Sequence, residues 1–203
     1  MNKKVYLCFI TVCFYTVSFS QTMSASSKKI NSTLKRLPSN PRYFTDNSGK
    51  AIFFFFSHTW ENFQDMSSEE GRPKLDWKGY LDMMEEYNHN FMRFWVWEHP
   101  TRQAWTRTKI YINPMPYKRI GKDTANDGKP KFDLDQWNEA YFERMRNRII
   151  DAGNRGIYVS VMLFQGWSLN KLNIQGADPF LSHPFNKANN INGINVINTT
   201  SDE

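Results

Sequence analysis

The stretch that most constrains the fold is the apolar run 157–167, which reads IYVSVMLFQGW. It is rich in β-branched and aromatic residues, follows the turn sequence DAGNRG, and ends in Gln-Gly-Trp. Such a run is typical of a strand that is buried on both faces of a parallel sheet. The runs 51–56 (AIFFFF) and 91–97 (FMRFWVW) have the same character. The sequence therefore predicts a parallel sheet of the α/β class.

Two helical patterns separate the three runs. Residues 76–89 place Trp77, Leu81 and Met84 on one face, and Asp76 precedes them as an N-cap. Residues 133–152 carry a longer apolar stripe, and Asp133 with Gln136 resembles a capping box at its start. Alternating strands and helices are typical of β/α barrels and doubly wound folds, in which ligands bind at the carboxyl ends of the strands.

The length of the chain limits how much of such a fold it can contain. Three strand-plus-helix or strand-plus-loop units can be identified, at about 51–90, 91–154 and from 157 onward. A closed (β/α)8 barrel needs eight strands and roughly 250 residues, and an open sheet of three strands would expose large apolar faces. We therefore expect residues 38–203 to be the N-terminal part of a (β/α)8 TIM barrel, truncated near Glu203.

The N-terminus has the pattern of a signal peptide. Lys3 and Lys4 precede an apolar segment at 5–19, which is too short to span a bilayer, and Ser18 and Ser20 are small residues at a cleavage site. We predict that residues 1–20 are removed, that 21–37 is a polar spacer, and that no stable membrane span remains. An uncleaved anchor is the alternative. Since both cysteines lie inside this segment, the mature chain would hold no disulfide, which suits a protein exported by a bacterium to the periplasm, the cell surface or the medium.

Polar and aromatic side chains follow each of the three predicted strands. Because the carboxyl ends of parallel strands meet at one edge of a sheet, we expect these side chains to form one site. Arg93 lies on the strand face expected to point into the barrel, where a charge needs a carboxylate partner. The alternatives are a structural ion pair for Arg93 and a structural, hydrogen-bonded role for His58. The candidates at the strand ends are His58, Trp60 and Glu61, then Trp97 and Glu98, then Gln165 and Trp167.

The two loop regions bear on the possible partners. Residues 101–131 interleave basic and aromatic side chains, as nucleic-acid binders also do. We interpret them as a solvated loop beside the site, and expect no nucleic-acid partner, since the net charge is only +6. Asn189 and Asn190 lie in an Asn- and Gly-rich stretch that suits tight turns and hydrogen bonding to sugar hydroxyls equally. The four histidines lack metal-ligand spacing, so we expect neither a metal nor a cofactor.

Several short motifs together carry a family resemblance. They are NPRYF at 40–44, HTWENFQD at 58–65, NFMRFW at 90–95, DLDQWNEAYF at 133–142, RGIYVSVMLF at 155–164 and HPFN at 183–186. As a set, over about 38–195, they resemble the cellulase-like and apiosidase-like bacterial glycoside hydrolases. The resemblance implies a (β/α)8 barrel, secretion, and hydrolysis of plant or host glycans by two carboxyl groups.

The same resemblance guides the roles of the candidate residues. In such enzymes the acid/base follows strand four and the nucleophile follows strand seven, positions that would lie beyond Glu203, so we expect this chain to be inactive alone. Arg93 matches the arginine that supports the nucleophile, while Glu61 and Glu98 are expected to contact substrate or to support residues that do. The alternative is a non-catalytic glycan- or matrix-binding protein. The residues expected to bind carbohydrate are His58, Trp60, Glu61, Arg93, Trp97, Glu98, Gln165, Trp167, His183, Asn189 and Asn190.

Overall fold

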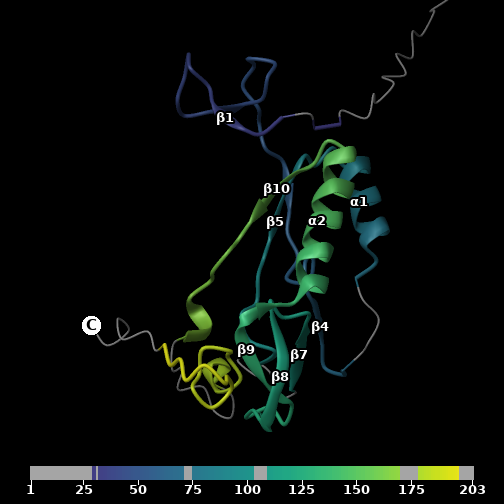
Figure 1. Ribbon diagram of the computed structural model, residues 1–203. Helices are drawn as coiled ribbons and strands as arrows, with labels where there is room; N and C mark the ends of the chain where they lie inside the picture. The colour runs from purple at the N-terminus through teal and green to yellow at the C-terminus, as the bar shows by residue number, and fades with distance from the viewer. Residues whose placement is uncertain (1–28, 31, 71–74, 103–108, 170–177, 197–203) are drawn as a thin grey trace, which may run out of the picture.

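The computed structural model describes residues 29–30, 32–70, 75–102, 109–169 and 178–196 (Figure 1). The predicted signal peptide lies outside these residues, as does most of the predicted spacer. In chain order the elements are β1 (Lys35–Arg36), β2 (Phe44–Thr45), β3 (Phe56–Ser57), β4 (Asp65–Ser67), α1 (Trp77–Glu86), β5 (Phe91–Phe94), β6 (Thr101–Arg102), β7 (Ile110–Asn113), β8 (Tyr117–Thr124), β9 (Pro130–Trp137), α2 (Glu139–Asn154), β10 (Tyr158–Val161), and the 3-10 turns η1 (Trp167–Leu169) and η2 (Pro179–Leu181).

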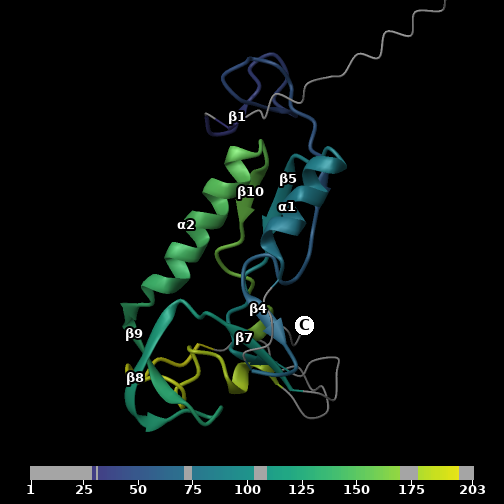
Figure 2. The ribbon, with the colours of Figure 1, turned by 90° about the vertical axis from the view of Figure 1, so that its right-hand side faces the viewer.

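A three-stranded parallel sheet forms the middle of the molecule, in the order β10-β5-β3. Its register pairs Phe91 with Tyr158 on one side and with Phe56 on the other. The connection from β3 to β5 contains α1, and that from β5 to β10 contains α2. Figure 2 shows the two helices side by side, so both lie on the same face of the sheet. The other face carries no helix among the described residues.

Local sequence explains where the first helix begins and which face it buries. The Asp76 carboxylate accepts a hydrogen bond from the Gly79 backbone N–H at 2.9 Å, which satisfies a free donor of the first turn. Leu81 and Met84 lie one turn apart and are both fully buried. They join the main core between the helices and the sheet, where burial of each large side chain contributes roughly 1.5–3 kcal/mol. That core consists of Phe63, Leu81, Met84, Met92, Phe94, Val96, Tyr141, Ala152 and Ile157.

The second helix begins later than the sequence predicted. Its N-cap is Asn138, and the predicted capping box lies in β9 instead. The Asp133 carboxylate accepts hydrogen bonds from the Asp135 backbone N–H and from the Gln136 side chain, so it closes a turn rather than a helix. Pairing with β8 and the isolated bridge from Phe132 to Asn190 hold this segment extended.

Much of the region predicted to be a solvated loop forms strands. β6 and β7 join β4 in an antiparallel sheet, and β8 with β9 forms a long hairpin. The residues 103–108, which include Trp105, lie outside the described part of the chain. A second small core packs beneath these strands around Trp97, Ile112, Met115 and Phe132. The segment 178–196 is attached to the hairpin, since the Phe132 N–H donates to the Asn189 carbonyl at 2.8 Å.

The prediction of several units of a TIM barrel was wrong. The described strands form four small sheets, and the parallel sheet does not close into a barrel. Only two α-helices are present among the described residues. One reason is visible in the run 51–56, where Ile52 bridges Phe44 in an antiparallel manner while only Phe56 and Ser57 pair with β5. The run is divided between two partners and cannot form one long buried strand.

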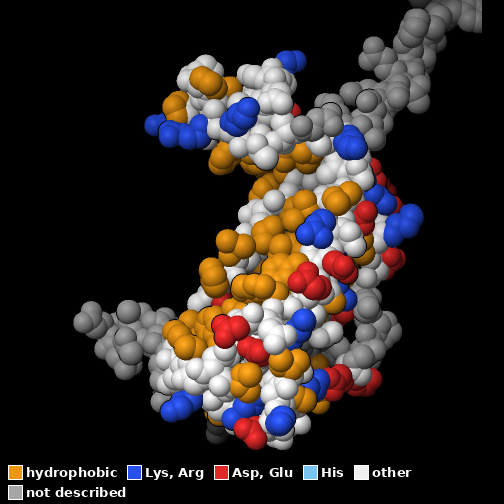
Figure 3. Space-filling model, viewed as in Figure 1, with side chains coloured by type: hydrophobic (Ala, Val, Ile, Leu, Met, Phe, Trp, Pro, Cys, Tyr) orange, Lys and Arg blue, Asp and Glu red, His pale blue; other side chains and the backbone are white. Residues whose placement is uncertain are grey.

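The prediction that the parallel sheet is buried on both faces was also wrong, because the face without helices is uncovered. Phe56 is 66% exposed and Phe164 is 73% exposed, and Figure 3 shows apolar side chains gathered along the hollow side of the molecule. Arg93 was predicted to point into a barrel interior and to need a carboxylate partner. Its side chain is exposed instead, so solvent supplies the compensation that burial would have required.

Candidate functional site

Four tryptophans and two histidines make continuous contacts around the carboxyl ends of β3 and β5. We call Trp60, Trp95, Trp97, Trp167, His58 and His99 the tryptophan cluster. The Trp60 ring lies 4.7 Å from that of Trp95 and 5.6 Å from that of Trp97, as measured between centroids. Trp97 in turn contacts Trp167 at 6.2 Å in an edge-on arrangement. The prediction that polar and aromatic side chains meet at the strand ends therefore describes a real cluster of aromatic rings.

Gln64 fixes the position of the tryptophan cluster. Its side-chain oxygen accepts a hydrogen bond from the backbone N–H of Trp97 at 2.6 Å, and its side-chain amide donates to the backbone carbonyl of Trp97 at 3.0 Å. The indole N–H of Trp97 donates to the Trp60 carbonyl at 3.0 Å. Because Gln64 and Trp97 are both buried, these bonds are shielded from water and hold the cluster rigidly.

The cluster has an accessible side and an available donor. Trp60 is 44% exposed, whereas Trp97 is 1% exposed, so Trp60 presents the open ring. The indole N–H of Trp95 is buried and has no hydrogen-bond partner among the described residues. A buried donor without a partner is costly, and a ligand placed against Trp60 and Trp95 could accept this hydrogen bond. His58 completes this side, with its ring 5.1 Å from that of Trp60.

Glu98 connects the ends of the two longer parallel strands. Its Oε2 accepts hydrogen bonds from the backbone N–H groups of Gln165 at 3.0 Å and Gly166 at 3.1 Å. Burial raises the pKa of Glu98, and these two hydrogen bonds oppose part of that rise. A carboxyl group with a raised pKa at the end of a strand is a candidate for a functional role. Gln165 also bonds Ser168 through its amide at 3.0 Å.

The other predicted carboxylate, Glu61, lies in a separate environment. Its pKa is raised first by burial and then by the negative charge of Asp65. Asp65 is itself paired with Arg144 at 3.0 Å. Asp65, and not Glu98, is the charged neighbour that acts on Glu61. Arg93 lies with its guanidinium 5.5 Å from the centre of the Trp95 ring, beside the tryptophan cluster.

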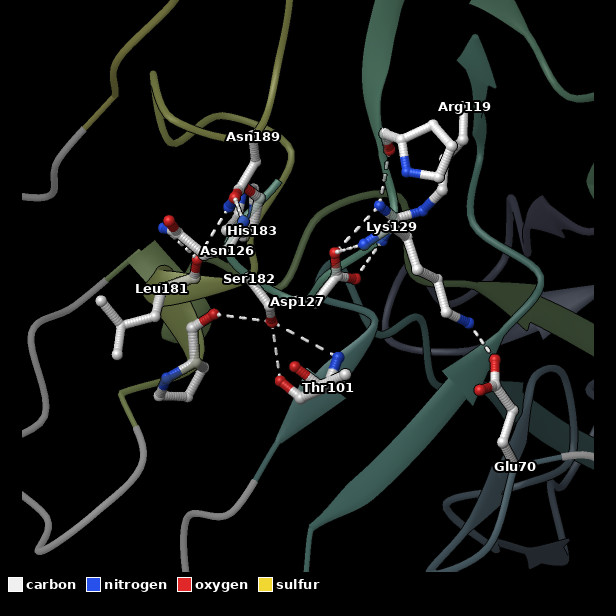
Figure 4. A network of polar contacts seen from close by, with 12 residues as sticks. Glu70, Thr101, Arg119, Asn126, Asp127, Lys129, Leu181, Ser182, His183 and Asn189 are labelled. Atoms are coloured by element: carbon white, nitrogen blue, oxygen red, sulfur yellow. Dashed lines mark hydrogen bonds and ion pairs between the residues drawn. The ribbon is translucent and has the colours of Figure 1, made fainter. Parts of the chain in front are cut away.

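Three predicted residues lie in the segment 178–196. His183, Asn189 and Asn190 are all buried. Figure 4 shows the Asn189 amide beside the Leu181 carbonyl, to which it donates at 2.8 Å, and it also donates to the His183 carbonyl at 2.9 Å. The Asn190 amide likewise donates to backbone carbonyls of the same segment. The side chains of Asn189 and Asn190 therefore hold the segment together.

A further polar network anchors this segment to the hairpin. The Ser182 hydroxyl donates to the Thr101 carbonyl at 2.7 Å, and the Asn126 N–H donates to the Asn189 side chain at 2.9 Å (Figure 4). Nearby, Asp127 forms a bidentate ion pair with Arg119, whose guanidinium lies 3.9 Å from the Phe132 ring centre. These contacts hold the segment 178–196 against the hairpin, and the Arg119 guanidinium is already paired with Asp127.

Comparison with known proteins was informative at the level of the family. Residues 38–190 match the model of the apiosidase-like catalytic domain. The chain belongs to the apiosidase-like catalytic-domain family. No significant match was found among curated proteins or among solved structures. The match spans the tryptophan cluster, Glu98 and the segment with His183, and it supports a glycosidase-type function for the apiosidase-like domain. It confirms the resemblance to apiosidase-like enzymes inferred from the motifs.

Two residues of the apiosidase-like domain were missed by sequence reasoning. Trp95 lies between Trp60 and Trp97 in the cluster, and its place on the same strand face as Trp97 was the signal that could have identified it. Gln64 gave no such signal, because its role depends on backbone groups of Trp97 and Pro114 that are far away in sequence.

The apiosidase-like domain shows no sign of a metal centre within the described ranges. No group of three or more His, Cys, Asp or Glu side chains there is arranged to hold a metal ion. Within these ranges, no helix is long and apolar enough to cross a membrane.

Proposed function

We propose that this protein is an exported glycosidase that acts on a plant or host polysaccharide or oligosaccharide. The observation that carries the proposal is the family match over 38–190, which includes a rigid aromatic cluster with one exposed tryptophan and an unused indole donor. Sugar rings have an apolar face and several hydroxyl groups. An amphipathic aromatic surface such as that of Trp60 and Trp95 suits both.

The geometry supports a binding role for the two predicted carboxylates. Glycoside hydrolysis uses two carboxyl groups on either side of the scissile bond. Glu98 uses one oxygen to hold two backbone N–H groups, and no described contact relates it to Glu61. We therefore assign Glu61 and Glu98 to substrate contact, with His58, Trp60, Trp97, Trp167 and Arg93 around the sugar. His183, Asn189 and Asn190 support the segment next to the site.

A non-catalytic glycan-binding protein is the second candidate. It is favoured by one observation, namely that Glu98 uses its Oε2 to hold the backbone N–H groups of Gln165 and Gly166. Such a protein would bind sugar with saturation and would release no reducing ends. A glycosidase would bind sugar with saturation and would also release reducing ends.

Replacement of Trp60 by alanine should separate these functions from a general loss of structure. We expect Trp60→Ala to weaken the binding of an oligosaccharide to this chain by about 10- to 100-fold, because a stacking surface worth roughly 1–3 kcal/mol is lost. Isothermal titration with a panel of plant and host oligosaccharides is the measurement. Tyr87→Ala, which removes an exposed ring at the end of α1, is the matched control. Equal loss of binding in both variants, or no binding of any glycan by the parent protein, would contradict the proposal.

Export is the second part of the proposal. Residues 1–20 carry the basic start, the short apolar segment and the small residues of a cleavable signal. We expect the protein recovered from the periplasm or medium of a bacterial host to begin at Gln21. N-terminal sequencing of that protein checks this, and a membrane-bound product that retains Met1 would show that the segment is an anchor.

A further inference from the structure

A cavity lies on the helix side of the sheet, away from the exposed ring of Trp60. Its volume is about 520 Å³, within the range of roughly 300–1,000 Å³ typical of small-molecule sites. It lies between the end of β5, the open ends of β8 and β9, the first turns of α2 and the segment 183–185. The lining residues used below are Glu98, Tyr117, Trp137, Phe142, His183 and Phe185.

Aromatic rings form one wall of this cavity. Tyr117 and Trp137 are stacked with 5.2 Å between ring centroids and 23° between ring planes. Phe142 meets Trp137 edge-on at 5.5 Å, and Phe185 lies 6.0 Å from Tyr117. Trp137 is 52% exposed although it lines the cavity, so a broad ring face remains available. A flat aromatic ligand would extend this stack and would remove that face from water.

His183 supplies a directed hydrogen-bond donor at the same cavity. Its Nδ1 accepts a hydrogen bond from the Phe185 N–H at 2.9 Å, so in the neutral ring the proton is on Nε2. The side chain is 1% exposed, and its Nε2 has no hydrogen-bond partner among the described residues. A buried donor without a partner calls for an acceptor from a ligand. Glu98 offers the complementary acceptor, because only its Oε2 is used by the Gln165 and Gly166 backbone.

We propose that this cavity binds a planar aromatic ring with oxygen substituents, as in the aglycone of an aryl glycoside. The stacked wall takes the ring, the Nε2–H of His183 donates to a carbonyl or ether oxygen, and Glu98 accepts from a phenolic hydroxyl. A sugar fits the cavity less well, because its many hydroxyls would face Phe142, Phe185 and other apolar groups without hydrogen bonds. The aglycone role rests on the proposed glycosidase function, whereas the binding of the aromatic ring does not.

The test uses 4-methylumbelliferone, a planar phenol with a lactone carbonyl and no sugar. Isothermal titration of the full chain should show saturable binding. Trp137→Ala should weaken it about tenfold, because the stacking face is lost. His183→Asn should weaken it about fivefold, since asparagine can keep the acceptor at the Nδ1 position but lacks the Nε2–H. Tyr87→Ala, which removes an exposed ring outside the cavity, is the control and should leave the affinity unchanged.

The outcomes distinguish this inference from the proposed function. Saturable binding that depends on Trp137 supports the cavity even if no glycoside is hydrolysed. Absence of saturable binding overturns it, as does equal weakening by Tyr87→Ala and Trp137→Ala. Displacement of the probe by a methyl glycoside, which has the sugar without the aromatic ring, would show a sugar site and would also overturn it. Far-UV circular dichroism of each variant confirms that the fold is kept.

Discussion

The free energy of unfolding is expected to fall by about 3 kcal/mol between neutral pH and pH 4 or below because of one side chain, His183. This residue is almost completely buried in the segment 178–196. Burial lowers its pKa from the ordinary 6.5 to about 4. Its ring contacts Phe180 and Phe185, which cannot solvate an imidazolium ion. The folded protein therefore holds this histidine in its neutral form.

Whether acid stabilises or destabilises the protein depends on which state, folded or unfolded, binds more protons. In the unfolded chain His183 takes up a proton near its ordinary pKa of 6.5, while in the folded chain it does so only near pH 4. Between these values the unfolded state binds more protons, so acid favours unfolding. The stabilisation is fully present above pH 6.5 and is lost as the pH falls through 4. Glu98, whose pKa is raised by burial, acts in the opposite direction at the same cavity.

Urea unfolding at pH 7, 5 and 4 measures this dependence. His183→Asn should remove most of the fall, because asparagine does not titrate and can keep the hydrogen bond from the Phe185 N–H. His58→Asn is the matched control, since the His58 side chain is exposed. If the His183→Asn variant lost stability with acid as steeply as the parent protein, groups other than His183 would govern the acid response.

The sequence predicted the elements in which local pattern and tertiary contacts agree. The run 91–97 contains β5, the run 157–164 contains β10, and the pattern at 76–89 contains α1 with Asp76 as its cap. In each case an apolar period coincides with burial against the main core. The pattern failed where distant partners decide the structure. Asp133 lies in a strand, not at a helix start, because β8 and Asn190 pair with its neighbour Phe132.

The candidate site was predictable in part for a related reason. Aromatic residues that directly follow an apolar run, such as Trp60 and Trp97, can be identified from the sequence alone. The hydrogen bonds of Gln64 join segments more than thirty residues apart and leave no local trace. The cavity wall of Tyr117 and Trp137 was missed because it depends on the hairpin, which the sequence had indicated as a loop followed by the start of a helix.

Arg148 is expected to contribute as much to the free energy of unfolding as His183 does. Its contribution is present at every pH at which the protein is folded. It is buried on α2, and its guanidinium donates to the carbonyl oxygens of Asn62 at 2.6 Å and Phe63 at 3.3 Å. It also lies 4.8 Å from the centre of the Trp77 ring. Burial, followed by repulsion from Arg144, lowers its pKa to about 10, so it remains charged at neutral pH.

Arg148→Met should lower the free energy of unfolding by about 3 kcal/mol, because two buried carbonyls lose a charged donor. Arg146→Met is the matched control on the same helix and should change it by less than about 0.5 kcal/mol, since that side chain is exposed. Urea unfolding at pH 7 provides both values. The carbonyls of Asn62 and Phe63 adjoin Gln64, which fixes Trp97, so the loss should also loosen the tryptophan cluster. If Arg148→Met were as stable as Arg146→Met, the helix would not be what positions this cluster, and the hydrogen bonds of Gln64 alone would have to explain its rigidity.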